Sequence, residues 1–141
     1  MFDVLIIGGG AAGMSCALVL GSAEPKEYAA NKKIGIIMHQ RASHLQSALF
    51  NNVLGLKPGT LGTDILESGK SQLTELYPHV LQIEKEKVKS VVKTPKGFTV
   101  NTNKNSYDTE LVVVAVGYTN LVKIDGLQKY LEPHPRAAVE K

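Results

Sequence analysis

The sequence predicts an α/β fold, in which a parallel sheet with helices carries a small antiparallel β-meander. Two short runs of β-forming apolar residues, Phe2–Ile7 and Ile34–Met38, are typical of buried parallel strands. The small apolar residues of Met14–Gly21, between the two runs, predict a helix packed tightly on the sheet. A strand, a helix and a second strand at this spacing favour a right-handed parallel unit.

The middle of the chain adds a loop, a helix and a third strand. Arg41–Gly62 is rich in glycine and proline breakers, and a long irregular segment in a compact domain is often functional. Thr63 and Asp64 can cap a helix that runs to about Leu76. His79–Ile83 then predicts a third parallel strand.

The last part of the pattern is antiparallel. Between about residues 86 and 109, short strands alternate with turns, which predicts the meander. The apolar run Leu111–Val116 predicts a strand that ends at Gly117. Pro133 and Pro135 lie in a tail that we expect to be irregular.

Composition excludes several classes of protein. The chain has 141 residues, of which 43% are hydrophobic, so a disordered chain is not expected. The formal charge of +3 is small, and we expect no nucleic-acid binding. No uninterrupted apolar run reaches the roughly 20 residues that a membrane span needs, and no membrane association is expected. The single cysteine, Cys16, favours a reducing compartment, the cytoplasm, and we assign no metal ligands.

A glycine loop joins the first strand to the helix. The residues Gly8 to Gly13 follow the pattern G-x-G-x-x-G. Gly8 permits a tight turn, Gly10 lets the backbone approach a pyrophosphate, and Gly13 lets the helix lie close to the strand. Free N–H groups at the helix start, including those of Ala11 and Ala12, would face the phosphates. The alternative is a glycine-rich turn that only packs a helix on a sheet.

This arrangement predicts a Rossmann-like FAD/NAD(P)-binding domain over residues 1–126, with the meander at about 86–109 and a tail at 127–141. In the same helix, Cys16 is predicted to be a small core residue and not a redox group.

The chain resembles the FAD-binding half of the pyridine nucleotide-disulfide oxidoreductases, in their thioredoxin-reductase-like branch. The opening DVLIIGGGAAGMSCAL is similar to that of the family, and the stretch from Gly69 to Thr102 resembles its helix, third strand and meander. YDTELVVVAVG resembles the strand that ends in the family's Ala-Thr-Gly motif, here Ala115, Val116 and Gly117. Ile124-Asp125-Gly126 resembles a small motif that follows.

The resemblance implies roles for particular residues. The glycine loop, with Gly8, Gly10, Ala11, Ala12 and Gly13, would hold the FAD pyrophosphate. Backbone groups near Lys87 and Val88 would contact adenine, and Ala115–Gly117 would pass close to the cofactor. The segment Arg41–Gly62 would lie near the flavin. The end of the second strand would bind the adenosine ribose; the residues found there are Met38, His39, Gln40 and Arg41.

Three departures from the family qualify this prediction. The family usually ends its second strand in an acidic residue, and here Gln40 or His39 could offer only a weaker hydrogen bond to a ribose hydroxyl. The sequence has no C-x-x-C pair, so disulfide reduction is not expected. Counterparts of the nicotinamide domain and of the C-terminal Gly-Asp segment do not follow Gly126, so a flavin would be partly uncovered unless a second copy or a partner chain covers it.

Three functions follow from the sequence. The first is a small FAD-dependent oxidoreductase, or a flavin-binding subunit of one, whose catalytic residues and substrate the sequence does not identify. The second is a degenerate dinucleotide-binding module without catalysis. The third is an NADP(H)-binding protein, since His39-Gln40-Arg41 resembles a basic cluster that binds a 2′-phosphate. We rank FAD first and NADP third.

Overall fold

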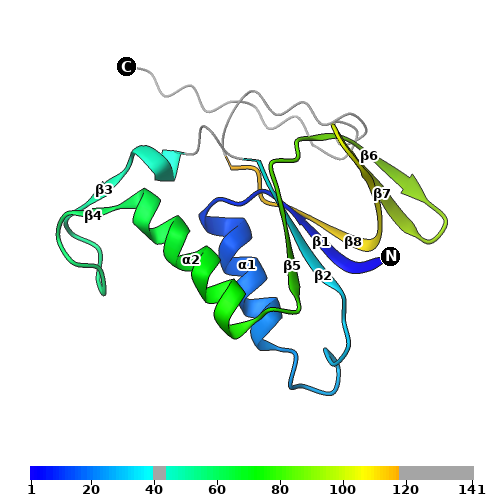
Figure 1. Ribbon diagram of the computed structural model, residues 1–141, viewed down its shortest axis with the longest axis horizontal. Coiled ribbons are helices and arrows are strands. Elements are labelled where there is room, and N and C mark those ends of the chain that lie inside the picture. The colour runs from blue at the N-terminus through cyan, green and yellow to red at the C-terminus, as the bar shows by residue number, and fades with distance from the viewer. Residues whose placement is uncertain (40–43, 118–141) are drawn as a thin grey trace, which may run out of the picture.

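The computed structural model describes residues 1–39 and 44–117 and confirms the α/β fold (Figure 1). Its main feature is a six-stranded sheet of order β5-β2-β1-β8-β7-β6. In chain order the elements are β1 (Phe2–Ile7), α1 (Ala11–Ser22), β2 (Ile34–Met38), the 3₁₀ helix η1 (His44–Ser47), β3 (Leu49–Phe50), β4 (Thr60–Leu61), α2 (Gly62–Leu76), β5 (Val80–Glu84), β6 (Val88–Thr94), β7 (Gly97–Thr102) and β8 (Ser106–Val114). Within the described residues, no helix is both long and apolar enough to span a membrane.

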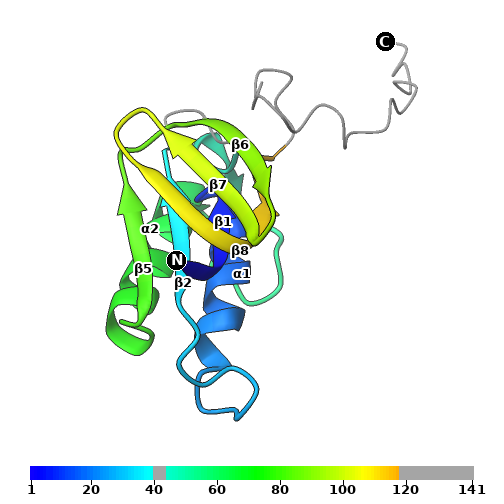
Figure 2. The ribbon, with the colours of Figure 1, turned by 90° about the vertical axis from the view of Figure 1, so that its right-hand side faces the viewer.

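The sheet has a parallel half and an antiparallel half. The strand β1 pairs in parallel with β2 on one side and with β8 on the other, and β2 pairs in parallel with β5. The strands β6, β7 and β8 pair antiparallel and form the predicted meander. The meander continues the same sheet and curls over one face of it, as Figure 2 shows.

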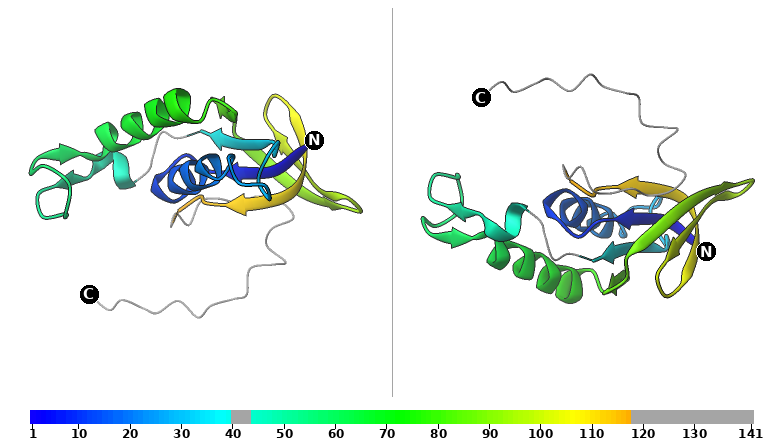
Figure 3. Two further views of the ribbon diagram at one scale, coloured as in Figure 1. Left: turned by 90° about the horizontal axis from the view of Figure 1, so that it is seen from below. Right: turned by 90° about the horizontal axis from the view of Figure 1, so that it is seen from above.

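Two hydrophobic cores result, one on each face of β1 and β2. On one face Ile6 and Ile36 pack against Met14, Ala17 and Leu73 of the two helices. The helices α1 and α2 lie side by side there (Figure 3). On the opposite face, the core is formed by Leu5, Ile7, Ile37, Ile83, Val91 and Val100. Because the meander covers this second face, β1 and β2 are apolar on both sides, as their continuous apolar sequences predict.

The third and last strands differ from their predicted limits. The third parallel strand runs from Val80 to Glu84, one residue later than predicted, and lies at the edge of the sheet. The predicted strand Leu111–Val116 is the second half of a longer strand, β8, which begins in the meander at Ser106 and ends at Val114. The strand β7 pairs with β8 only as far as Thr109.

The far edge of β8 therefore stays open. Beyond Thr109, it has no strand partner within the described residues. Leu111 and Val114 are 60% and 46% exposed.

The start of α2 and the segment before it also differ. The helix begins at Gly62, so Thr63 and Asp64 lie in its first turn, and the residue at the cap, Leu61, makes no side-chain capping bond. A side chain at Gly62 would overlap the carbonyl oxygen of Leu45, so the close approach of η1 fixes where the helix starts. The segment predicted as irregular also contains the two-stranded pairing of β3 with β4. Gln40, Arg41, the motif Ile124-Asp125-Gly126 and the tail at 127–141 lie outside the described residues.

Candidate functional site

The glycine loop packs against the segment that follows β8. Gly8 has a φ of +118°, and a side chain there would overlap the carbonyl oxygen of Ala115. A side chain at Gly13 would overlap the carbonyl oxygen of Gly8, and Ala115 lies beside it. The Ala115 N–H donates to the Ile7 carbonyl oxygen at 2.8 Å, which fixes the two segments together. The predicted tight turn at Gly8 and close packing at Gly13 are both present.

The N-terminus of α1 opens toward the same region. The helix begins at Ala11, and its cap residue, Gly10, offers no side-chain hydrogen bond. The first backbone N–H groups of a helix have no acceptor within the helix. Ala11 and Ala12 are exposed, while Gly10 is buried. Uncapped N–H groups and the positive end of the helix dipole make this end of α1 suited to an anionic group such as a phosphate.

The end of β2 lies directly beside the glycine loop. Met38 is 6% exposed, and a side chain at Gly9 would come within 2.6 Å of the Met38 Cγ atom. Met38 therefore forms an apolar wall against the loop at the position where the family resemblance implies a carboxylate. His39 follows and is exposed.

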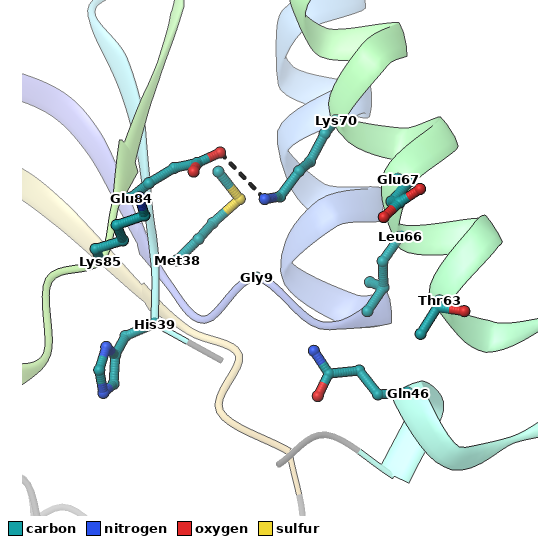
Figure 4. Close-up of a pocket in the computed structure, with 10 residues that line it drawn as sticks. All are labelled: Gly9, Met38, His39, Gln46, Thr63, Leu66, Glu67, Lys70, Glu84 and Lys85. Atoms are coloured by element: carbon teal, nitrogen blue, oxygen red, sulfur yellow. Dashed lines mark hydrogen bonds and ion pairs between the residues drawn. The ribbon is translucent and has the colours of Figure 1, made fainter. Parts of the chain in front are cut away.

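A cavity of about 480 Å³ extends from the glycine loop to the groove between α2 and the ends of β2 and β5 (Figure 4). Its lining residues are Gly9, Met38, His39, Gln46, Thr63, Leu66, Glu67, Lys70, Glu84 and Lys85. The volume lies in the range of small-molecule sites. The walls are mixed, with the apolar side chains of Met38 and Leu66 among charged groups of both signs.

An ion pair crosses this cavity from helix to sheet. Lys70 Nζ of α2 lies 3.1 Å from Glu84 Oε1, at the end of β5, and both side chains remain a little over 40% exposed. In Figure 4, the pair lies next to the Met38 sulfur. The strands place Glu84 in direct register with Met38. The one carboxylate in this cavity that the sheet contributes thus comes from the strand next to β2.

The β5–β6 connection forms one rim of the cavity. Lys85 has a φ of +58°, which is uncommon for a residue with a side chain, and its N–H donates to the Met38 carbonyl oxygen at 3.0 Å. The Lys87 N–H donates to Asn103 Oδ1 at 2.7 Å, and the Asn103 N–H donates to the Lys87 carbonyl oxygen at 2.9 Å. Both polar backbone groups of Lys87 are therefore engaged within the protein. Val88 is the first residue of β6.

A buried carboxylate holds this rim to the meander. Glu86, 6% exposed, accepts hydrogen bonds from Thr102 Oγ1 at 2.6 Å, Asn105 Nδ2 at 2.7 Å and the Tyr107 hydroxyl at 3.0 Å. The bond from Thr102, followed by those from Asn105 and Tyr107, holds the pKa of Glu86 below its ordinary value, although burial opposes this. For Tyr107, burial and the bond to Glu86 raise the pKa.

Cys16 lies away from this cavity. It is partly buried in α1 and packs against the core cluster under the two helices. Burial raises the pKa of its thiol, which disfavours the reactive thiolate. In the described part of the chain, no group of three His, Cys, Asp or Glu side chains could hold a metal ion.

The structure gathers most of the predicted site residues at one edge of the sheet. The glycine loop meets Ala115 directly, and Met38 and His39 line the cavity beside it. Val116 is partly buried, whereas Gly117 is exposed with a φ of +72°. The other residues that line the cavity were not assigned to the site from the sequence: Gly9, Gln46, Thr63, Leu66, Glu67, Lys70, Glu84 and Lys85. For Glu84 a signal was present, because it stands at the end of a predicted parallel strand, where binding residues collect.

Known proteins match the chain along most of its length. The family model described as pyridine nucleotide-disulphide oxidoreductase matches residues 2–137. A ferredoxin–NADP reductase from Levilactobacillus brevis is 30% identical over 116 residues, which are 82% of this chain and 34% of that protein. The chain therefore spans about a third of the length of this curated relative.

Solved structures give the same result. A thioredoxin reductase from Streptococcus pyogenes has a TM-score of 0.69 at 25% identity, over 87% of this chain and 37% of the reductase chain. A thioredoxin reductase from T. acidophilum has a TM-score of 0.65 at 27% identity, over 92% of this chain and 40% of its own. The family match over residues 2–137 includes both the sheet and the glycine loop.

Proposed function

Because the chain belongs to the pyridine nucleotide-disulphide oxidoreductase family, we propose that it binds FAD at the glycine loop and serves as the flavin-binding unit of a small oxidoreductase. The observation that carries the proposal is the open N-terminus of α1, framed by Gly8, Gly13 and Ala115. This geometry offers N–H groups to a pyrophosphate and keeps side chains out of its way. The adjoining cavity has room for the adenosine end of the dinucleotide.

Each part of the proposed site has a distinct task. The N–H groups at the start of α1 would hold the pyrophosphate, and the apolar wall of Met38 would exclude water beside it. Ala115–Gly117 would pass close to the cofactor. FAD would supply the electron transfer itself, and the protein would supply binding and orientation.

Cys16 packs in the helical core and takes no part in the proposed chemistry. We expect a second copy or a partner chain to cover the flavin, and the exposed Leu111 and Val114 on the free edge of β8 are candidates for that contact.

The decisive experiment identifies the small molecule that the purified protein releases on denaturation. We expect FAD, with an absorption spectrum of the native protein typical of bound flavin. A flavin-free preparation should take up FAD on titration. Release or uptake of NADP(H) alone would replace the FAD proposal with the NADP one. Failure to bind either nucleotide would favour the degenerate module.

A further inference from the structure

The end of β2 lacks the carboxylate that usually binds the adenosine ribose in a dinucleotide site. In such sites an acidic residue after the second strand accepts hydrogen bonds from the ribose hydroxyls. Here Met38 ends the strand, and its side chain packs on Gly9 with 6% exposure. A thioether accepts hydrogen bonds only weakly, so Met38 cannot replace a carboxylate.

The neighbouring strand places a carboxylate next to this position. Glu84 ends β5 and is the direct register partner of Met38. Adjacent strands lie about 4.8 Å apart, a distance that a glutamate side chain can span. Figure 4 shows the Glu84 carboxylate and the Met38 sulfur close to one another in the cavity, with Gly9 at the other end of the Met38 side chain. The carboxylate therefore comes from the strand next to β2 and not from β2 itself, and it lies in the same cavity.

The ion pair leaves this carboxylate available to a ligand. Lys70 Nζ binds Oε1 at 3.1 Å, while Oε2 has no hydrogen-bond partner among the residues that the structure describes. The Glu84 side chain is 44% exposed. Lys70 also offsets the negative charge of Glu84, which would otherwise repel a pyrophosphate held at the glycine loop.

We propose that Glu84 is the residue that binds the adenosine ribose hydroxyls, in place of an acid at the end of β2. This assignment rests on the proposed dinucleotide function and adds a specific ligand to it. Lys70 pairs with Oε1 and offsets the charge of Glu84, while the preference for the ribose hydroxyls comes from the carboxylate itself. The other acidic group of the cavity, Glu67, comes from α2 and has no strand partner to place it beside Met38.

The test compares two probes that differ only in the ribose hydroxyls, ADP and 2′,3′-dideoxyadenosine diphosphate. Both are titrated calorimetrically into the full chain after removal of any bound nucleotide. The parent should bind ADP roughly ten- to a hundredfold more tightly, since one hydrogen-bonded charge is worth about that factor. Glu84→Gln should lose most of this preference while binding dideoxy-ADP like the parent. Glu75→Gln, an exposed change of equal charge on α2, is the matched control and should keep the preference.

A further variant separates a ribose ligand from a structural ion pair. Lys70→Met breaks the pair but keeps the carboxylate, so the preference for ADP should persist. If Lys70→Met and Glu84→Gln lose the preference for ADP equally, and both have lower thermal stability, the ion pair matters only for folding. That result would overturn the proposal. The proposal would also be overturned if Glu67→Gln lost the preference for ADP and Glu84→Gln kept it.

The result also separates this inference from the proposed function. If the parent binds ADP and its dideoxy analogue equally, the ribose assignment is wrong while dinucleotide binding stands. If the parent binds neither ADP nor FAD, the proposed function fails, and the assignment of Glu84 fails with it.

Discussion

Gly8 and Gly13 depend on one neighbour, the backbone around Ala115. A side chain at Gly8 would overlap the Ala115 carbonyl oxygen, and one at Gly13 would overlap the Gly8 carbonyl oxygen. Two motifs separated by about a hundred residues therefore meet at one point. Each motif could be predicted from its residue types, because only glycine and residues with small side chains fit where two backbones approach so closely. The contact between the two motifs could not be predicted, since it depends on β1 and β8 being neighbours in the sheet.

Gly10 and Gly13 should respond differently to the same substitution. Gly10 has φ −80° and ψ −170°, a conformation open to any residue, so Gly10→Val should fold while its side chain occupies the space of the pyrophosphate. We expect FAD binding to be lost. Gly13→Val should instead lower the free energy of unfolding by about 1–3 kcal/mol or more through overpacking. Titration with FAD and thermal denaturation measure the two effects.

The matched control for Gly10→Val is Ser15→Val, an exposed position in the same helix. It should bind FAD like the parent. If Gly10→Val also binds FAD like the parent, the loop serves only to pack the helix.

Cys16 should be dispensable for any redox activity. Its thiol lies in the helical core with a pKa raised by burial, so little thiolate is present near neutral pH. Cys16→Ala should keep turnover within about twofold and lose at most a modest amount of packing energy. Steady-state rates at matched flavin content provide the measurement. A large loss of turnover with unchanged flavin content would reveal a redox role for the thiol.

Glu86 should make stability depend on pH in the acid range. Hydrogen bonds from Thr102, Asn105 and Tyr107 lower its pKa in the folded state. A lowered folded pKa gives stability that is present above the unfolded pKa and is lost as the pH falls through the folded value. The parent should therefore lose stability as the pH falls below about 4.5, the ordinary value.

The variant Glu86→Gln tests this assignment. It should be about 1–3 kcal/mol less stable at pH 7 and should show a flatter decline in acid. Urea denaturation across a pH series measures both. Glu75→Gln, at an exposed site, should follow the parent curve; a parallel decline of Glu86→Gln and the parent would contradict the assignment.

At the scale of elements, α2 shows which features local sequence can predict. Its buried residues Gly62, Leu66, Gly69 and Leu73 recur at helical spacing, and its end at Leu76 was predictable from the proline that follows Tyr77. The start of α2 could not be predicted, because the contact of Gly62 with Leu45 of η1 determines it and no side chain caps the helix.

The full length of β8 could not be predicted either. Its two halves have different strand neighbours, so they appear in the sequence as two runs of different periodicity.

Packing between the two helices should outweigh helix propensity at Gly69. Glycine in a helix interior usually costs about 1 kcal/mol relative to alanine, so propensity alone predicts that replacement stabilises α2. However, a side chain at Gly69 would lie 2.7 Å from Met14 Cγ of α1. We expect Gly69→Val to destabilise the protein by about 1–3 kcal/mol. Chemical denaturation of this variant, beside the exposed Ser68→Ala, gives the comparison; a stabilised Gly69→Val would contradict the helix contact.

At the scale of the whole molecule, the sheet order brings the site together. The strands β5, β2 and β1 end at one edge, so the glycine loop, Met38 and Glu84 meet there although they lie far apart in sequence. Strand ends beside the first βα turn are the general location of dinucleotide sites. The fold class and the glycine loop were predictable because each follows from local patterns. The role of Glu84 was not, because the register between β2 and β5 is a tertiary property.

The last prediction concerns the choice between FAD and NADP(H), which depends on the charge at this edge as a whole. His39, Lys70 and Lys85 line the cavity and Arg41 follows in sequence, while Glu67 and Glu84 supply the opposing charge. An added carboxylate in His39→Glu should repel the 2′-phosphate of NADP(H) and weaken its binding by roughly tenfold or more. FAD has no such phosphate, and Glu84 already supplies its proposed ribose ligand, so FAD binding should change little.

Two comparison variants complete this test. His39→Gln, which adds no charge, is the control, and Arg41→Ala should leave FAD binding nearly unchanged. Calorimetric titration of each variant with FAD and NADPH gives the affinities. If the parent binds NADPH and not FAD, and both Arg41→Ala and His39→Glu weaken NADPH binding, the charges at this edge select a 2′-phosphate. The FAD assignment must then give way to NADP.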